Sequence, residues 1–150
     1  MIDEHVSEFI DAPVHEVFHF MSRVETLPEW LDGCKESWAI SDDPYCVGAE
    51  VAHIDQVMGQ TFEAHFEVVE WDENSRMVFK ALDGPFAGTS DERFRPEGDG
   101  TRVDIYVRGE LTGAFKLGEW AARRVARKQL RRSIDNAKRI VESRRAERTR

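Results

Sequence analysis

The longest periodic segment of the chain lies near its C-terminal end, over residues 116–142. Apolar and small side chains recur there every three or four positions, as on one face of an α-helix. They are Ala122, Val125, Ala126, Leu130, Ser133, Ile134, Ala137, Ile140 and Val141. About 27 helical residues would extend roughly 40 Å, enough to cross a small domain. We expect residues 143–150 to form a basic tail with a frayed end.

The preceding pattern predicts one strand, two short helices and then six strands. An alternating run over residues 4–10 predicts the first strand. Pro13 suits the first turn of the helix that follows, with Asp11 as a candidate cap, and a second short helix is expected over residues 24–31. The later strands are expected over residues 35–41, 49–58, 60–72, 76–82, 89–96 and 101–111. Short turns between them predict an antiparallel meander.

The alternation along two of these strands predicts which face of the sheet is buried. If the intervening turn centres near Gly59, residues whose numbers sum to about 118 lie opposite one another. The apolar face then carries Ala52, Ile54, Met58, Phe62, Ala64, Phe66 and Val68, and the polar face carries His53, Asp55, Glu63, His65 and Glu67. An antiparallel sheet with one apolar face needs a cover, and the long helix is the largest element left to supply it.

Composition indicates a single globular domain, which we expect over residues 1–142. The chain has 150 residues, of which 41% are hydrophobic, and no apolar run approaches the ~20 residues of a membrane span. Its beginning is charged and has no apolar signal segment, so we expect a cytoplasmic protein without a membrane span. Cys34 and Cys46 lack zinc-ligand spacing, and we assign them no role.

The net charge of -8 conceals two oppositely charged regions. Residues 1–115 contain 8 Lys and Arg against 25 Asp and Glu, whereas residues 116–150 contain 13 against 4. A basic helix can bind an anionic partner, but its apolar stripe must first be buried. We therefore expect its cations to meet the acidic rim of the sheet in the same molecule, and no nucleic-acid partner.

The order of the elements resembles the helix-grip, or START-like, superfamily (SRPBCC), in its polyketide cyclase/dehydrase branch. The resemblance is carried by the Phe9-Ile10-Asp11-Ala12-Pro13 run followed by Val17-Phe18, by Leu27-Pro28-Glu29-Trp30, Val47-Gly48 and Glu70-Trp71-Asp72, and by Phe94-Arg95-Pro96 before Gly100-Thr101-Arg102-Val103. It implies an α+β fold, in which a curved antiparallel sheet of about seven strands wraps on a long C-terminal helix, with two short helices after the first strand.

The resemblance also implies a cavity between sheet and helix that holds a small hydrophobic or amphipathic molecule. The candidate ligand-binding residues are Ile54, Phe62, Ala64, Phe66, Phe79, Phe86, Ile105, Phe115, Ala122, Val125, Ala126, Gln129 and Ser133. The small residues of the helix would leave volume beneath it or allow close packing. Gln129 would supply a polar contact in the pocket or lie at the edge of the stripe in water.

Two glycine-bearing connections, residues 83–88 and 112–117, would lie near the mouth of that cavity if the chain follows the family. Their aromatic residues are Phe86 and Phe115. The connections would gate entry or serve as plain turns.

The group formed by His53, Asp55, Glu63, His65 and Glu67 has the chemistry of a zinc or acid–base site. Its predicted phase points it into solvent, so an exposed polar face is the simpler interpretation. We expect no metal and no cofactor, and no catalytic residue can be assigned.

Three functions remain open. The first is binding of a small hydrophobic molecule, by a monomer or a homodimer. The second is a cyclase/dehydrase-like enzyme acting on an aromatic or polyketide compound, which an inward-facing titratable residue would favour. The third is an interaction module that uses the basic helix.

Overall fold

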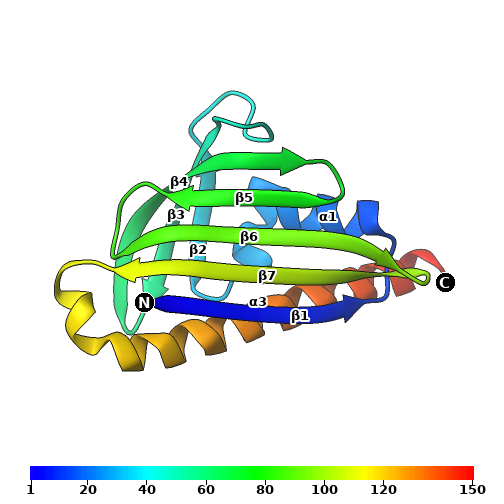
Figure 1. Ribbon diagram of the computed structural model, residues 1–150. Helices are drawn as coiled ribbons and strands as arrows, with labels where there is room; N and C mark the ends of the chain where they lie inside the picture. The colour runs from blue at the N-terminus through cyan, green and yellow to red at the C-terminus, as the bar shows by residue number, and fades with distance from the viewer.

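Seven antiparallel strands form one strongly curved sheet. The computed structural model describes residues 1–150, except for the side chains of Ala114 and Phe115. The strands are β1 (Ile2–Ile10), β2 (Cys34–Ala39), β3 (Glu50–Val57), β4 (Gln60–Asp72), β5 (Arg76–Ala81), β6 (Phe86–Glu97) and β7 (Gly100–Leu111). Their order is β1-β7-β6-β5-β4-β3-β2, a meander closed on one side by β1. In Figure 1, β2 and β3 run at a steep angle to β6 and β7, which shows the curvature.

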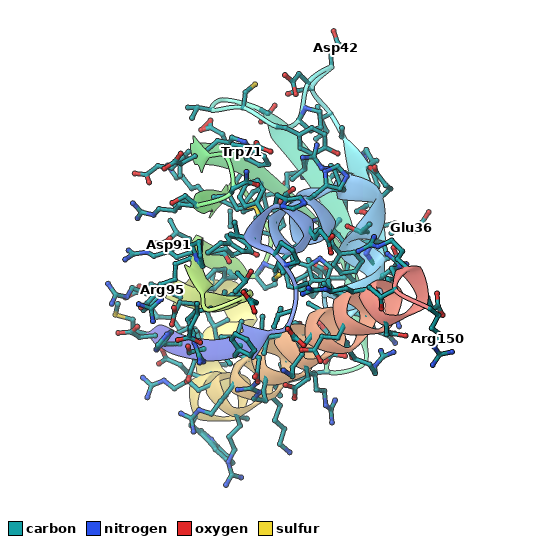
Figure 2. The ribbon with its side chains drawn as sticks, turned by 90° about the vertical axis from the view of Figure 1, so that its right-hand side faces the viewer. Glu36, Asp42, Trp71, Asp91, Arg95 and Arg150 are labelled. Atoms are coloured by element: carbon teal, nitrogen blue, oxygen red, sulfur yellow. The ribbon has the colours of Figure 1, made fainter. Side chains whose placement is uncertain are left out.

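The helices lie on the inner face of this sheet, the face toward which it curls. They are α1 (Val14–Ser22), η1 (Val24–Thr26), α2 (Leu27–Trp30), η2 (Gly113–Gly118) and α3 (Glu119–Arg148). Figure 2 shows the short helices enclosed by the sheet, with α3 beside them. The predicted strand, helix pair, meander and long helix are all present, so the predicted fold class is confirmed.

Two predictions at the helix ends are wrong. The residue that caps α1 is Pro13, and no described side chain hydrogen-bonds to that end. The Asp11 backbone N–H instead donates to the Glu142 carboxylate, at 2.9 Å. The predicted end of the long helix at residue 142 is also wrong, since α3 continues to Arg148. Arg144 and Arg148 pair there with Glu29 and Glu16, each at 2.6 Å, which favours further helical turns.

The turn between β3 and β4 decides which side chains of these strands face inward. Met58 and Gly59 have φ values of 51° and 78°, so both residues fit a two-residue hairpin turn with positive φ. Val57 therefore pairs with Gln60. The predicted pairing, in which residue numbers sum to about 118, is wrong by one residue, and such a slip moves every side chain to the other face.

As a result, the odd-numbered residues of β3 share the inner face with the even-numbered residues of β4. His53 lies opposite Ala64, and Asp55 lies opposite Phe62. The prediction that His53 and Asp55 point outward is therefore wrong. So is the prediction that Ala52 and Ile54 point inward.

The C-terminal half of α3 packs on a filled core, and its N-terminal half lies over a cavity. Ile134, Ala137 and Val141, in the C-terminal half, are buried in the main core together with residues of α1 and α2. The N-terminal half carries Ala122 and Ala126 over a hollow. Both interpretations of the small residues thus apply, close packing at one end of the helix and open volume at the other.

The cations of α3 meet the acidic rim of the sheet, as predicted. Arg127 pairs with Glu4 of β1 at 3.1 Å, Arg131 pairs with Glu8, and Lys138 lies 3.8 Å from Glu8. Pairs this exposed contribute little to stability, but they fix the helix along the edge strand. None of the helices in the described chain offers the long apolar stretch that crossing a bilayer requires.

Candidate functional site

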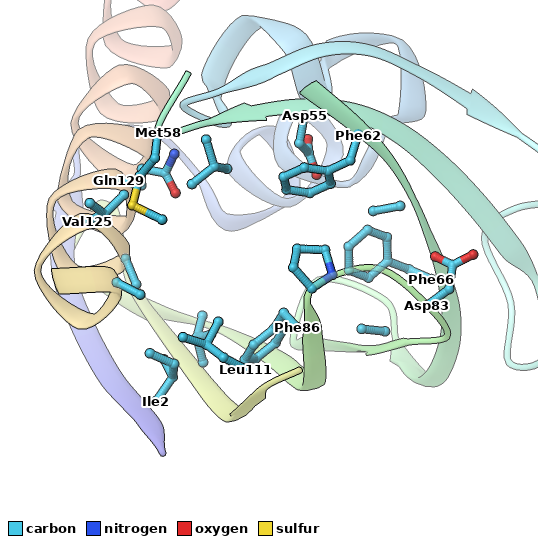
Figure 3. A pocket seen from close by; sticks show the side chains of 17 residues that line it. Ile2, Asp55, Met58, Phe62, Phe66, Asp83, Phe86, Leu111, Val125 and Gln129 are labelled. Carbon is cyan, nitrogen blue, oxygen red and sulfur yellow. The ribbon is translucent and has the colours of Figure 1, made fainter. Parts of the chain in front are cut away.

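A cavity of about 220 Å³ lies between the N-terminal half of α3 and the strongly curved part of the sheet. Figure 3 shows Val125 and Gln129 on the helical wall, Asp55, Phe62 and Phe66 on the wall formed by β3 and β4, and Phe86 and Leu111 below them. The lining is almost entirely apolar, and its volume is just below the ~300–1,000 Å³ of most small-molecule sites.

Most of the residues predicted to bind a ligand line this cavity. They are Phe62, Ala64, Phe66, Phe86, Ala122, Val125, Ala126 and Gln129. The connection before β6 contributes Pro85 as well, so this predicted mouth loop does border the hollow.

The remaining predicted residues lie elsewhere. Ile54 is on the outer face because of the register described above. Ile105 belongs to the packed core, and the half-buried Phe79 packs against it. The Ser133 hydroxyl accepts a hydrogen bond from the Asp32 N–H at 2.9 Å and donates one to the Gln129 carbonyl at 2.7 Å, so it ties α3 to the segment before β2. The Phe115 side chain lies outside the described residues.

Several lining residues were not predicted. Ile2, Val57, Ala81, Val107 and Leu111 complete the apolar wall, together with Met58 of the turn. Ile2 precedes the predicted start of its strand at residue 4, whereas Leu111 lies at the correctly predicted end of β7. Val57 and Asp55 could have been found only with the correct register of the hairpin.

Of the three polar side chains that line the cavity, Asp83 lies beside Phe66 with its carboxylate on His65, and the other two lie toward the opposite end (Figure 3). These two are Asp55, on the inner face of β3, and Gln129, on α3. Gln129 also lies close to Gly33, because a Cβ added at Gly33 would meet its Nε2 at 3.1 Å. This end of the cavity can therefore hold a hydroxyl or carbonyl group of a ligand whose remainder contacts the aromatic wall.

Two more polar side chains lie behind Asp55. Cys34 pairs with Asp55 across the β2–β3 ladder, and His53 lies two residues before Asp55 on the same face. The His53 ring packs against Phe66, with 4.7 Å between ring centroids. Burial raises the pKa of the Cys34 thiol to about 12, and the charge of Asp55 adds to the rise.

The rest of the predicted polar group lies on the outer face, as expected. His65 contacts Asp83 through Nδ1 at 2.5 Å and Glu63 through Nε2 at 2.9 Å. The hydrogen bond with Asp83 raises the pKa of His65, and the negative charges of both carboxylates act in the same direction. The group that the sequence places on one face is therefore divided between the two faces.

A buried carboxyl group, missed at the sequence level, lies deeper on the inner face. Glu92 of β6 pairs with Met77 on one side and Ile105 on the other, and is 6% exposed. Burial raises the pKa of this carboxyl to about 8, with a further contribution from the charge of Asp91. Its Oε1 has no hydrogen-bond partner among the described residues. Burial thus favours the neutral form of this carboxyl.

The sequence matches one family model and resembles many solved structures. The family described as "Polyketide cyclase / dehydrase and lipid transport" matches over residues 1–142. No curated protein gives a significant match.

Three solved structures illustrate the shared fold. TTHA0849 from Thermus thermophilus is 21% identical, with a TM-score of 0.81 over 94% of this chain and 97% of that protein. A START superfamily protein from Mycobacterium smegmatis is 18% identical, with a TM-score of 0.74 over 94% and 97%. The di-domain ARO/CYC StfQ from the steffimycin biosynthetic pathway is 14% identical, with a TM-score of 0.77 over 97% of this chain and 52% of StfQ. At these identities the likeness shows the helix-grip fold alone.

Proposed function

Since the chain belongs to the polyketide cyclase/dehydrase and lipid transport family, we propose that it binds a small hydrophobic or amphipathic molecule between α3 and the curved sheet. The observation that carries the proposal is the cavity of about 220 Å³, with an aromatic wall and two polar side chains at one end. A cavity lined this way favours a compact, largely apolar ligand with one or two oxygen atoms.

The division of α3 into two halves supports the proposal. Its C-terminal half packs on a filled core, so the stability of the domain does not depend on filling the space beneath Ala122 and Ala126.

Binding of naphthol, a bicyclic aromatic alcohol that matches the cavity in chemistry, tests the proposal. We expect saturable binding to the wild-type protein, followed by fluorescence. Ala126→Leu fills the cavity from the helical wall and should weaken binding at least tenfold, with the thermal midpoint little changed. Ala146→Leu, on the exposed end of the same helix, is the matched control and should bind like wild type. Equal binding by all three proteins would refute the proposal.

Native mass spectrometry provides a second test that requires no chosen ligand. The purified protein should carry a compound that is released on denaturation, and A126L should carry less of it than A146L. The same spectra will show whether the protein is a monomer or a homodimer.

A second candidate function is catalysis of a cyclase/dehydrase type, favoured by the inward position of Asp55. A carboxylate beside a bound poly-β-ketone could accept a proton from the carbon between two carbonyl groups, after which that carbon attacks a third carbonyl and closes a ring. The apolar wall would hold the chain in a folded conformation. StfQ, which shares the fold, is described as an ARO/CYC protein.

Asp55→Asn tests this second candidate separately from binding. If Asp55 is the base, D55N should bind naphthol within about twofold of wild type and should lose at least ~100-fold in the rate of cyclisation of a poly-β-ketone analogue. Equal activity of wild type and D55N would refute Asp55 as the catalytic base.

A further inference from the structure

Three side chains with metal-binding chemistry meet at the polar end of the cavity, although they are far apart in the sequence. Cys34 lies at the start of β2, and β2 pairs Cys34 with Asp55 of β3. His53 lies on the same face, because alternate residues of a strand point the same way. One donor atom from each of the three residues lies within 4.8 Å of the other two.

We propose that Cys34, His53 and Asp55 form a binding site for a divalent transition metal, with zinc as the best match. Thiolate, imidazole and carboxylate are the three donor types that zinc accepts in proteins. The charges also balance, since one thiolate and one carboxylate neutralise a divalent ion. On binding, the Cys34 thiol releases its proton to solvent.

The separations suit a metal better than a direct contact. His53 Nδ1 and Asp55 Oδ1 are 3.7 Å apart, too far for a hydrogen bond. Two ligands at about 2.0–2.2 Å from a tetrahedral zinc ion are roughly 3.3–3.5 Å apart. The His53–Asp55 separation is therefore close to that of two zinc ligands, and the Cys34 sulfur lies within 4.8 Å of both donor atoms.

The surroundings of the three residues also favour a metal. Cys34 is 7% exposed, and the side chains of His53 and Asp55 are 12% and 20% exposed. The ring of Phe66 packs against the imidazole. Donors buried to this degree are protected from competing solvent, which distinguishes them from the exposed His65 group on the outer face.

The proposed site leaves a position for a ligand. Three protein donors leave the fourth position of a tetrahedral ion free, and Asp55 itself lines the cavity. The fourth ligand would be water, or a hydroxyl or carbonyl oxygen of the molecule in the cavity, which the metal would orient and polarise.

Metal titration of the full-length protein, after removal of bound metal with a chelator, tests the proposal. Calorimetry with Zn²⁺ alone should show one site per chain, and Cys34→Ser, His53→Gln and Asp55→Asn should each weaken it at least tenfold. Substitution with Co²⁺ should give a thiolate-to-cobalt charge-transfer band that C34S abolishes. Circular dichroism shows whether each variant is folded, and D55N, at the edge of the cavity, is the variant least dependent on packing.

Two matched variants serve as controls. Cys46→Ser removes the exposed cysteine, and His65→Gln removes the histidine that lies between two carboxylates on the outer face. Both should bind Zn²⁺ like wild type. The proposal is overturned if Zn²⁺ does not bind, if binding survives in C34S and D55N, or if H65Q abolishes it. Naphthol binding is measured without metal, so its outcome is independent of this test.

Discussion

Asp55 and Phe62 lie directly opposite each other across the β3–β4 ladder, and both line the same cavity. A carboxylate and an aromatic ring therefore share one wall of the cavity. The register predicted from the sequence places these two residues on opposite faces of the sheet. The relationship follows from a two-residue turn at Met58 and Gly59. It gives the cavity its polar end and places His53 on the inner face of the sheet.

The register predicts different effects for apolar substitutions on the two faces of the sheet. Ile54→Ala, on the outer face, should leave the dissociation constant for naphthol unchanged within about twofold. Phe66→Ala, on the cavity wall, should raise it at least tenfold, because a ring in contact with the ligand is lost. Fluorescence titration of both variants measures this. A larger effect of I54A would mean that the pairing of β3 and β4 differs from the one described.

Glu92 should make stability depend on pH. Its pKa is about 8 in the folded protein against 4.5 as the ordinary value, so between these values the unfolded chain ionises while the folded protein keeps its proton. The free energy of unfolding should therefore fall as the pH rises from about 4.5 to about 8, by at most ~1.4 kcal/mol per unit from this group.

The variant Glu92→Gln isolates this contribution, because glutamine stays neutral. Urea unfolding across that pH range should show a smaller decline for E92Q than for wild type, so that E92Q becomes the more stable of the two near pH 8. Parallel curves for the two proteins would show that Glu92 is ionised in the folded state.

Gly33 should be intolerant of a side chain. Its φ is 91°, and an added Cβ would lie 2.9 Å from the Gln56 carbonyl oxygen. Gly33→Ala should cost ~2–4 kcal/mol of unfolding free energy, since both backbone strain and a close contact are introduced. Gly98→Ala is the control, with a φ of 59° and no atom within 4 Å, and should cost only ~1 kcal/mol. Equal losses in urea unfolding would mean that contacts around Gly33 relax freely.

Ser133 should contribute to stability and not to ligand affinity. Ser133→Ala leaves the Asp32 N–H without its acceptor, which should cost ~1–3 kcal/mol. Ser143→Ala, on the exposed side of the same helix, should change stability by less than ~0.5 kcal/mol. Thermal unfolding measures both. A loss of naphthol affinity in S133A without a loss of stability would instead place the hydroxyl in the binding site.

Local sequence patterns were sufficient to predict the fold and one wall of the site. The helical stripe over Ala122, Val125 and Ala126 and the alternation of Phe62, Ala64 and Phe66 arise from helix and strand geometry. They predict a one-sided sheet under a long helix. They also identify most of the apolar lining, because these residues lie on the covered faces of their own elements.

The other groups that face the cavity depend on contacts between distant segments. The conformation of Met58 and Gly59 changes the pairing by one residue, which reverses the faces of Ile54 and Asp55. The meeting of Cys34 with His53 and Asp55 depends on pairing between β2 and β3, whose register shifts near Cys34. Whether small residues of α3 cover a hollow or a filled core depends on where α1 and α2 pack. These are long-range relationships, so the periodicity of a single segment does not contain them.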